Sequence, residues 1–273
     1  MRRLVACGAM VVLGAATTRP AAAQNPLDRL RRAAQSVANI ARTLLPISTE
    51  KEIDIGRGVA ATVAGRYPLA TDTALNRYVN LVGLAVASVD PRGDIAYHFA
   101  VLDTPDVNAF ASPGGYIFIT RGSLSLIESE SELAGVLAHE VGHVNRRHVI
   151  EAIRKSDTMR AVRDQADLKG GVLDQVVGTG ANTLFSGLSR EDELQADSLG
   201  FEYAAAAGYD PAGLASFITR LNSHAGEGPL AEMFATHPRP DERSVRLAGI
   251  AQRDRYPAGE TLADRYRASV RKP

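Results

Sequence analysis

Two histidines and a glutamate lie within one five-residue stretch, His139-Glu140-Val141-Gly142-His143. In an α-helix, residues four apart share a face, so the two imidazoles can bind one metal ion. Glu140 projects about 100° around the helix, where it can reach a water on that metal without binding the metal itself. Zinc lowers the pKa of bound water to about 7, and a glutamate can take the released proton and pass it to a leaving amine. The stretch therefore predicts metal-dependent hydrolysis with Glu140 as the general base.

A catalytic zinc ion usually has three protein ligands and one open position, so a third ligand must come from elsewhere. A metzincin would have glycine at position 146 and histidine at position 149. Arg146 and Val149 stand there instead, which excludes that class. His148 would project about 140° away from His143 if the helix continued, so we interpret it as a surface or structural histidine.

An acidic pair later in the chain offers the missing ligand. Glu193 and Asp197 are four residues apart in a segment expected to be helical from 189 to 207, so they share a face. One of them can bind the metal while the other accepts the N–H of a ligand histidine. Glu191 and Asp192 fall on other faces and suit the positive end of the helix dipole.

The joint pattern resembles the gluzincin metallopeptidases and, within them, the family of the CAAX prenyl protease, HtpX and BepA. The resemblance covers about residues 50–250. Besides the histidine motif, it is carried by Asn108-Ala109-Phe110, Gly114-Gly115-Tyr116-Ile117-Phe118-Ile119, Gly122-Ser123-Leu124, Arg190-x-x-Glu193-x-x-Ala196-Asp197, Gly208-Tyr209-Asp210-Pro211, Thr236-His237-Pro238 and Arg243.

The resemblance implies a role for each of these polar residues. One Zn²⁺ per chain would be bound by His139, His143 and Glu193, and Asp197 would orient a ligand histidine. His237 would lie near the metal, where it would either steady the reaction intermediate or cap the zinc in a latent state.

Arg243 is a weaker candidate in the same resemblance. It would help to stabilise the oxyanion, and a structural salt bridge is at least an equal alternative.

The segment Gly115–Thr120 has a physical interpretation of its own. An exposed edge strand can pair with an extended peptide through main-chain hydrogen bonds, which would hold a substrate across the metal. The alternative is an ordinary hairpin in the core sheet. The substrate-binding residues predicted on this basis and from the resemblance are Asn108, Ala109, Phe110, Gly115, Tyr116 and Ile117.

The elements that must position these residues follow from hydrophobic spacing and turn signals. Strands are expected at 95–102, 107–111 and 116–120, and helices at 50–64, 72–89, 131–155, 189–207, from 210 onward, and at 241–252. The glycine-containing segment 156–188 is expected to be mobile with some helix, and to serve either as a lid or as a plain surface connection. The resulting fold class is α+β and mainly helical, a zincin-like domain with a small mixed or antiparallel sheet beside the active-site helix.

The domain organisation is expected to be a signal peptide at 1–23, an N-terminal arm at 24–48, the peptidase domain at 49–253 and a polar tail at 254–273. Arg2 and Arg3, an apolar run and Ala21-Ala22-Ala23 fit a cleaved secretory signal. Export to the periplasm of a Gram-negative bacterium follows, with a retained membrane anchor or lipid anchor as the minor alternative. The arm could pack on the body or lie on a membrane surface.

The chain has 273 residues, equal numbers of acidic and basic residues and a single cysteine. This composition gives no indication of nucleic-acid binding, and it excludes an intrachain disulfide. We expect a zinc endopeptidase that acts on misfolded or unassembled envelope proteins. We expect it to lack the membrane spans and the helical-repeat domain found in members of the family that it resembles. The alternatives are a chaperone-like or regulatory binding protein and another metal-dependent hydrolase. The oligomeric state stays open.

Overall fold

The computed structural model describes residues 47–162, 170–224, 230, 233, 236–237, 243–247, 249–250, 256 and 259–270. The expected signal peptide and almost all of the expected N-terminal arm lie outside the described residues. The described helices of more than three residues are α2 (Thr49–Arg66), α3 (Thr73–Ala87), α4 (Arg121–Leu126), α5 (Glu130–Asn145), α6 (His148–Lys155), α7 (Asp157–Val162), α8 (Gly171–Ser186), α9 (Arg190–Ala206), α10 (Ala212–Ser223) and α13 (Ala263–Ser269).

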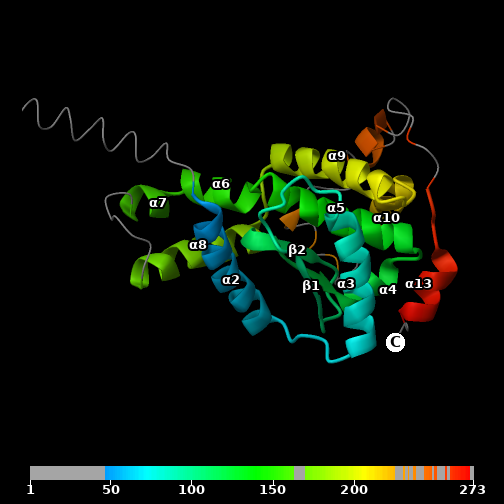
Figure 1. The fold of residues 1–273 in the computed structure, drawn as a ribbon, viewed down its shortest axis with the longest axis horizontal. Coiled ribbons are helices and arrows are strands. Elements are labelled where there is room, and N and C mark those ends of the chain that lie inside the picture. Colours follow the sequence, from blue (N-terminus) through cyan, green and yellow to red (C-terminus); the bar gives the residue numbers. More distant parts are fainter. Residues whose placement is uncertain are drawn as a thin grey trace, which may run out of the picture. The chain divides into compact units, whose positions relative to one another are not determined.

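A small mixed sheet lies among these helices (Figure 1). Its strands are β1 (His98–Leu102), β2 (Ala109–Ser112) and β3 (Tyr116–Thr120), in the spatial order β1-β3-β2. β3 pairs in parallel with β1 and antiparallel with β2, and a short 3₁₀ turn, η1 (Pro113–Gly115), joins β2 to β3. The fold class is therefore mainly helical α+β, as the sequence predicts.

Both faces of the sheet are buried, because side chains alternate across each strand. One face, with Ile117 and Ile119, belongs to the hydrophobic core that also contains residues of α3, α5, α9 and α10. The other face, with Phe110 and Phe118, belongs to a second core that contains residues of α2, α6 and α8. The sheet thus separates two layers of helices.

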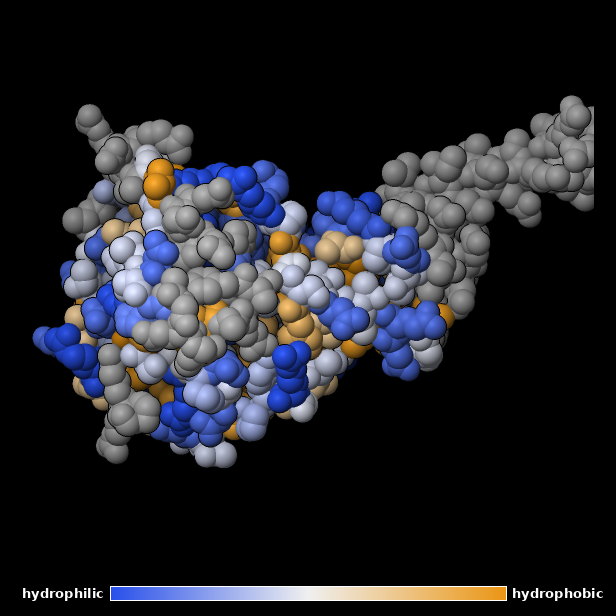
Figure 2. Space-filling view, turned by 180° about the vertical axis from the view of Figure 1, so that it is seen from behind, coloured by the Kyte–Doolittle hydropathy of each residue, from blue (hydrophilic) through white to orange (hydrophobic). Residues whose placement is uncertain are grey.

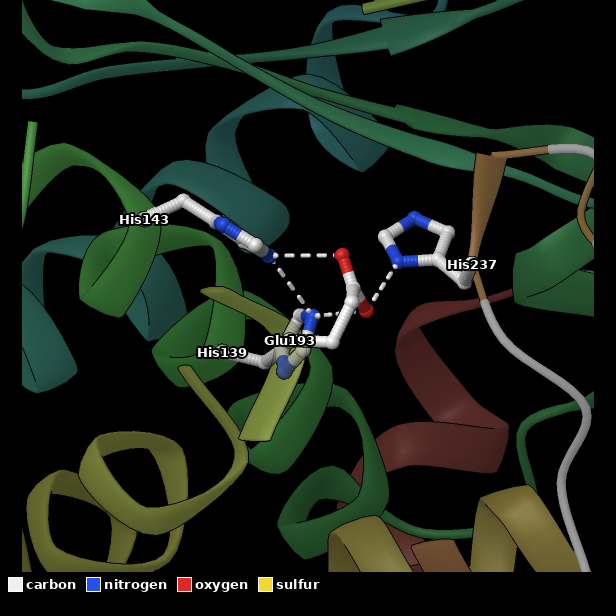
Figure 3. Close-up of side chains that lie close together, drawn as sticks. All are labelled: His139, His143, Glu193 and His237. Atoms are coloured by element: carbon white, nitrogen blue, oxygen red, sulfur yellow. Dashed lines mark hydrogen bonds and ion pairs between the residues drawn. The ribbon is translucent and has the colours of Figure 1, made fainter. Parts of the chain in front are cut away.

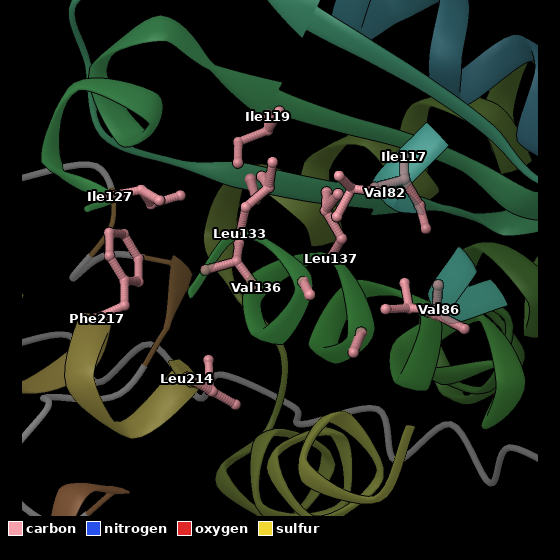
Figure 4. Packing of buried hydrophobic residues seen from close by; sticks show 14 of the residues in the cluster. Val82, Val86, Ile117, Ile119, Ile127, Leu133, Val136, Leu137, Leu214 and Phe217 are labelled. Atoms are coloured by element: carbon pink, nitrogen blue, oxygen red, sulfur yellow. The ribbon is translucent and has the colours of Figure 1, made fainter. Parts of the chain in front are cut away.

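Helix α5 runs through the first of these cores. Every residue from Glu130 to Val144 is buried. Figure 4 shows Leu133 and Leu137 of α5 near Ile119 and Ile117 of β3, with Phe217 of α10 beside Ile127. A helix that is buried all round cannot solvate its polar side chains, so each of them needs a partner inside the protein.

Most of the expected helix boundaries agree with the structure. Asp72 caps α3 by accepting a hydrogen bond from the N–H of Leu75, and Ser189 begins α9 with a reciprocal capping box to Asp192. Beyond the end of α9, Gly208 takes a left-handed conformation with φ of 88°. These helix ends can be predicted from the sequence because each cap depends on side chains only a few residues apart.

Two expectations differ from the structure. The helix expected at 131–155 is two helices, because α5 ends at Asn145 and α6 begins at His148. The segment expected as a polar tail includes α13, whose Tyr266 is fully buried in the first core with Val270 beside it. The short helix expected at 241–252 is described only in part, at 243–247 and 249–250.

The described surface is mixed in character. Figure 2 shows hydrophilic residues over much of one face, with smaller hydrophobic groups between them. Within the described ranges, no helix combines the length and the apolar character that a membrane crossing would need.

Candidate metal centre

Two imidazoles of α5 face each other at the centre of the site. The Nε2 atoms of His139 and His143 lie 3.0 Å apart, and each residue is only 3% exposed. The four-residue spacing along one helix produces this approach, as the sequence predicts. At most one of these nitrogens can point a proton at the other, so at least one of the two carries a lone pair at this position.

The carboxylate of Glu193, on α9, lies among these imidazoles (Figure 3). Its Oε1 atom is 3.4 Å from the Nε2 atom of His143, and its Oε2 atom is 3.6 Å from the Nε2 atom of His139. Burial alone would raise the pKa of Glu193, but the nearby charges of His237 and His143 hold it well below its ordinary value. The group is therefore a carboxylate at neutral pH.

One oxygen of this carboxylate lacks a donor. The Oε1 atom of Glu193 is buried and has no hydrogen-bond partner among the described residues. Leaving a buried charged oxygen unpaired costs roughly 1–3 kcal/mol or more. A cation between Glu193 and the two histidines would remove that cost.

His237 completes the cluster from the segment beyond α10. Its Nδ1 atom is 2.8 Å from the Oε2 atom of Glu193. One possible ligand atom from each of His139, His143, Glu193 and His237 can be chosen so that all four lie within 4.8 Å of one another. Zinc is bound by nitrogen and oxygen at about 2.0–2.2 Å, so donor atoms at these separations can be brought onto one ion by small side-chain movements.

A buried ion pair supports His139 from behind. Its Nδ1 atom is 3.1 Å from the Oδ1 atom of Asp197. Burial lowers the pKa of His139, but its hydrogen bonds to Asp197 and Glu193 outweigh that effect and raise the pKa to about 9. Arg243 holds the same Asp197 carboxylate at two points, with its Nε atom at 3.0 Å and its Nη2 atom at 2.6 Å. The salt-bridge alternative for Arg243 is therefore present, and its oxyanion role stays a prediction.

Glu140 lies beside the ligand cluster without belonging to it. It lines two neighbouring pockets, which share Glu140, Ala109 and His237. The first pocket is largely apolar, with Val136, Leu214, Phe217, Ile218 and Met233 in its wall. A carboxylate at the junction of two pockets can contact a substrate that extends through both of them.

Comparison of the sequence with known protein families identifies one match. The sequence profile of Peptidase family M48 matches residues 73–251. The chain belongs to peptidase family M48. The matched region contains every residue of the cluster, from the motif on α5 to His237.

The curated relatives are similar over different shares of their length. The beta-barrel assembly-enhancing protease of Escherichia coli (strain K12) is 26% identical over 237 residues, which are 82% of this chain and 49% of the relative. The mitochondrial metalloendopeptidase OMA1 of Arabidopsis thaliana is 36% identical over 156 residues, 56% of this chain and 31% of the relative. The metalloprotease LoiP of Escherichia coli (strain K12) is 31% identical over 155 residues, 55% of this chain and 61% of the relative. The chain spans about half the length of the assembly-enhancing proteases it matches.

The edge-strand prediction for Gly115–Thr120 is wrong in this M48 domain. β3 is the central strand and pairs on both sides, so the edge strands are β1 and β2. Gly115 packs against the Ala96 carbonyl, Tyr116 stacks on His98, and Ile117 is in the core. The sequence could identify the strands but could not order them, because a parallel pairing of β1 with β3 depends on tertiary packing.

The other expected substrate-binding residues lie next to the site. Ala109 and Phe110 are on the edge strand β2 and line the pockets. Asn108 is fully buried. Its Oδ1 atom accepts hydrogen bonds from the Ala109 N–H and the Thr236 hydroxyl. Asn108 therefore links β2 to the segment that carries His237.

Sequence reasoning placed one residue of the site wrongly. His148 was expected to project away from His143, but their Nδ1 atoms lie 2.9 Å apart and His148 is 3% exposed. The reason is the helix break, in which Arg147 takes a left-handed conformation with φ of 57°. Neither glycine nor proline marks this break, so the sequence contains no signal for it. Burial and the charge of His143 lower the pKa of His148 to about 4.

Proposed function

We propose that this M48 chain is a zinc-dependent endopeptidase with its centre at His139, His143 and Glu193. The observation that carries the proposal is the buried Glu193 carboxylate, whose unpartnered Oε1 atom faces the Nε2 atom of His143 while its Oε2 atom faces the Nε2 atom of His139. Two histidines and a glutamate form the ligand set of a known class of catalytic zinc sites. Calcium and magnesium prefer all-oxygen ligands, so they fit this donor set poorly.

The residues around the cluster would divide the work of peptide hydrolysis. Bound zinc would polarise a carbonyl and lower the pKa of water. Glu140 would accept a proton from that water and donate it to the leaving nitrogen, a contribution of roughly 10²–10⁴-fold in rate. Asp197 would hold His139 by its Nδ1–H, and Arg243 would keep Asp197 ionised and in place. His237 could either donate to the developing negative charge or cover the site in a latent state.

The edge strand β2 would bind the substrate in extended form. The Asn108 carbonyl accepts a hydrogen bond from the Thr120 N–H, and pairing alternates along an antiparallel ladder. The N–H and C=O groups of Ala109 and Ala111 therefore point away from β3, and both residues line a pocket beside Glu140. The Ala109 N–H is already bonded to the Asn108 Oδ1 atom, so the Ala109 carbonyl and the N–H and carbonyl of Ala111 would pair with the substrate. Main-chain pairing tolerates many side chains, which suits a protease of unfolded polypeptides.

The substrate class and location rest on similarity. The Escherichia coli relative is named for enhancing beta-barrel assembly. We extend this to misfolded or unassembled envelope proteins as substrates and to the periplasm as the place of action. The signal-like residues 1–23 support export.

The chemistry is tested with Glu140→Gln. We expect wild type to cleave casein, a chelator to stop the cleavage, and the variant to lose roughly 10²–10⁴-fold in rate while it keeps one zinc per chain. Glu151→Gln is the matched control, because Glu151 lies on the exposed side of α6 in an ion pair with Arg154. Zinc is measured by metal analysis of the same samples. A Glu140→Gln protein that cleaves like wild type would contradict the mechanism. A zinc-binding wild type without peptidase activity would favour the chaperone-like alternative.

A further inference from the structure

A second histidine, His148, contacts the ligand His143 on one side and residues of helix α9 on the other. The Nδ1 atom of His148 is 2.9 Å from the Nδ1 atom of His143. The Nε2 atom of His148 lies 3.4 Å from the Gln195 Oε1 atom and 3.6 Å from the Asp192 Oδ1 atom. Both imidazoles are almost completely buried. His148 is not part of the ligand cluster itself.

The positions of the protons on His143 and His148 follow from which nitrogen of His143 faces the metal ligands. The Nε2 atom of His143 faces the cluster, so its proton must lie on Nδ1 when Nε2 binds a metal. The Nδ1 atom of His148 must then accept that proton in a hydrogen bond, which leaves the proton of His148 on its Nε2 atom. That N–H points at the oxygens of Gln195 and Asp192, so every proton has an acceptor.

The acceptors of the His148 Nε2–H belong to helix α9. The Oδ2 atom of Asp192 accepts from the backbone and hydroxyl of Ser189 in the capping box, and its Oδ1 atom is directed at His148. The ligand Glu193 is the next residue of the same helix. The contacts therefore connect His143 on α5 to the helix that supplies the third ligand.

His148 lies next to His143 because the helix is interrupted between α5 and α6. If α5 continued, residue 148 would project about 140° from His143. The left-handed Arg147 instead turns the chain back, and its side chain is held by an ion pair with Glu52 at 2.9 Å and by the Ile47 carbonyl. Glu52, the ion-pair partner of Arg147, is fully buried.

We propose that His148 is a positioning residue that fixes the tautomer and ring orientation of the metal ligand His143. The inference rests on the proposed zinc site. His139 has a carboxylate, Asp197, as the acceptor for its Nδ1–H, whereas His143 has a neutral imidazole. Such outer partners typically change metal affinity by about 10–100-fold when they are removed.

The test compares two substitutions at the same position. His148→Leu introduces an apolar side chain of similar size and removes the acceptor, and we expect zinc to bind about 10–100-fold more weakly. His148→Asn places an oxygen where the Nδ1 atom now lies, and we expect affinity within a few fold of wild type. His98→Leu is the control, because His98 is an exposed residue that stacks on Tyr116. Affinity is measured by competition with a chromophoric chelator, and the melting temperature of the zinc-free protein is measured in parallel.

Three outcomes would overturn the inference. His148→Leu could bind zinc as tightly as wild type, His148→Asn could bind as weakly as His148→Leu, or His148→Leu could change only the melting temperature of the zinc-free protein. Failure of wild type itself to bind zinc would instead overturn the proposed zinc site.

A measurement on the wild type decides the matter even if the variants fail to fold. Long-range ¹H–¹⁵N correlation spectra of the zinc-loaded protein report which nitrogen of each histidine carries a proton. We expect His143 protonated on Nδ1 and His148 protonated on Nε2 alone. A proton on the Nδ1 atom of His148 would overturn the inference, because the two rings would then oppose N–H to N–H.

Discussion

At the scale of single residues, the site depends on charges that are buried together. Asp197 is fully buried and Arg243 is 4% exposed, and their side chains meet through two hydrogen bonds. Burial raises the pKa of Asp197, but the Arg243 charge and the His139 hydrogen bond hold it well below its ordinary value. Removing one member of such a pair leaves the other charge without a partner inside the core.

The cost of breaking this pair can be measured with Asp197→Asn. The substitution keeps the side-chain size but removes the carboxylate that Arg243 contacts most closely and leaves it only Glu193, whose Oε2 atom is 4.0 Å from its Nη1 atom. We therefore expect zinc-free protein to lose about 3 kcal/mol of unfolding free energy. Zinc affinity should also fall by about 10–100-fold, because His139 loses its carboxylate partner. Urea denaturation and chelator competition measure the two effects. Glu151→Gln, which breaks an exposed pair, should cost less than about 1 kcal/mol. Equal stability losses in the two variants would contradict the argument.

At the scale of elements, the site is set by how closely α5 and α9 approach. A Cβ atom added at Gly200 of α9 would lie 2.9 Å from the backbone nitrogen of His139 and 3.0 Å from its Cα atom. On the other helix, a Cβ at Gly142 would lie 3.3 Å from the Cα atom of Ala196. These two glycines therefore allow the helices to cross where Glu193 can reach both ligand histidines.

Gly200→Ala tests this close approach. Alanine in a helix interior gains about 0.5–1 kcal/mol over glycine, but overpacking of a core costs about 1–3 kcal/mol. The second effect should win, because the atoms in contact are backbone and cannot turn aside. We expect lower stability and weaker zinc binding, measured by urea denaturation and chelator competition. Gly178→Ala on α8 is the control: nothing lies within 4 Å of its added Cβ, so it should be neutral or stabilising. Stabilisation by Gly200→Ala would show that the crossing can relax.

The elements also show how far sequence could predict the site. The spacing of His139, Glu140 and His143 and the pair Glu193 and Asp197 were predictable, because each set lies within one helix of known periodicity. His148 was not, because its position depends on a left-handed arginine held by Glu52, nearly one hundred residues earlier in the chain. The order of the three strands was hidden for the same reason, since pairing partners are chosen by tertiary packing.

At the scale of the whole molecule, the N-terminus of α5 gathers three distant segments. The Glu130 carboxylate accepts hydrogen bonds from the hydroxyls of Tyr78 on α3 and Tyr209 beyond α9, both at 2.9 Å, and it pairs with Arg265 on α13. Glu130 is 1% exposed. The C-terminal helix is thereby attached to the same helix that carries the metal ligands, so its loss should weaken the fold around the site.

This hub predicts a specific dependence of stability on pH. Burial raises the pKa of Glu130, but the hydrogen bonds from Arg265, Tyr209 and Tyr78 outweigh it and hold the pKa below its ordinary value. In the unfolded chain the pKa returns to about 4.3. A carboxyl whose folded pKa is depressed contributes stability that is complete above the unfolded value and is lost as the pH falls through the folded value. Wild type should therefore lose this contribution below about pH 4.3.

Glu130→Gln separates that contribution from the rest of the acid transition. The variant should be less stable than wild type at pH 7, because the neutral amide cannot pair with the Arg265 charge and can match only part of the hydrogen bonding of the buried carboxylate. The difference should shrink as the pH falls below about 4.3, where wild type begins to lose the same carboxylate. Urea denaturation is followed from pH 7 to pH 3 in the presence of a chelator, since bound zinc would add its own pH dependence. Glu151→Gln should show no such convergence, because the Glu151 carboxyl is partly exposed and its pair with Arg154 contributes little. Parallel curves for wild type and Glu130→Gln would mean that the Glu130 carboxylate does not stabilise the junction of α3, α5 and α13.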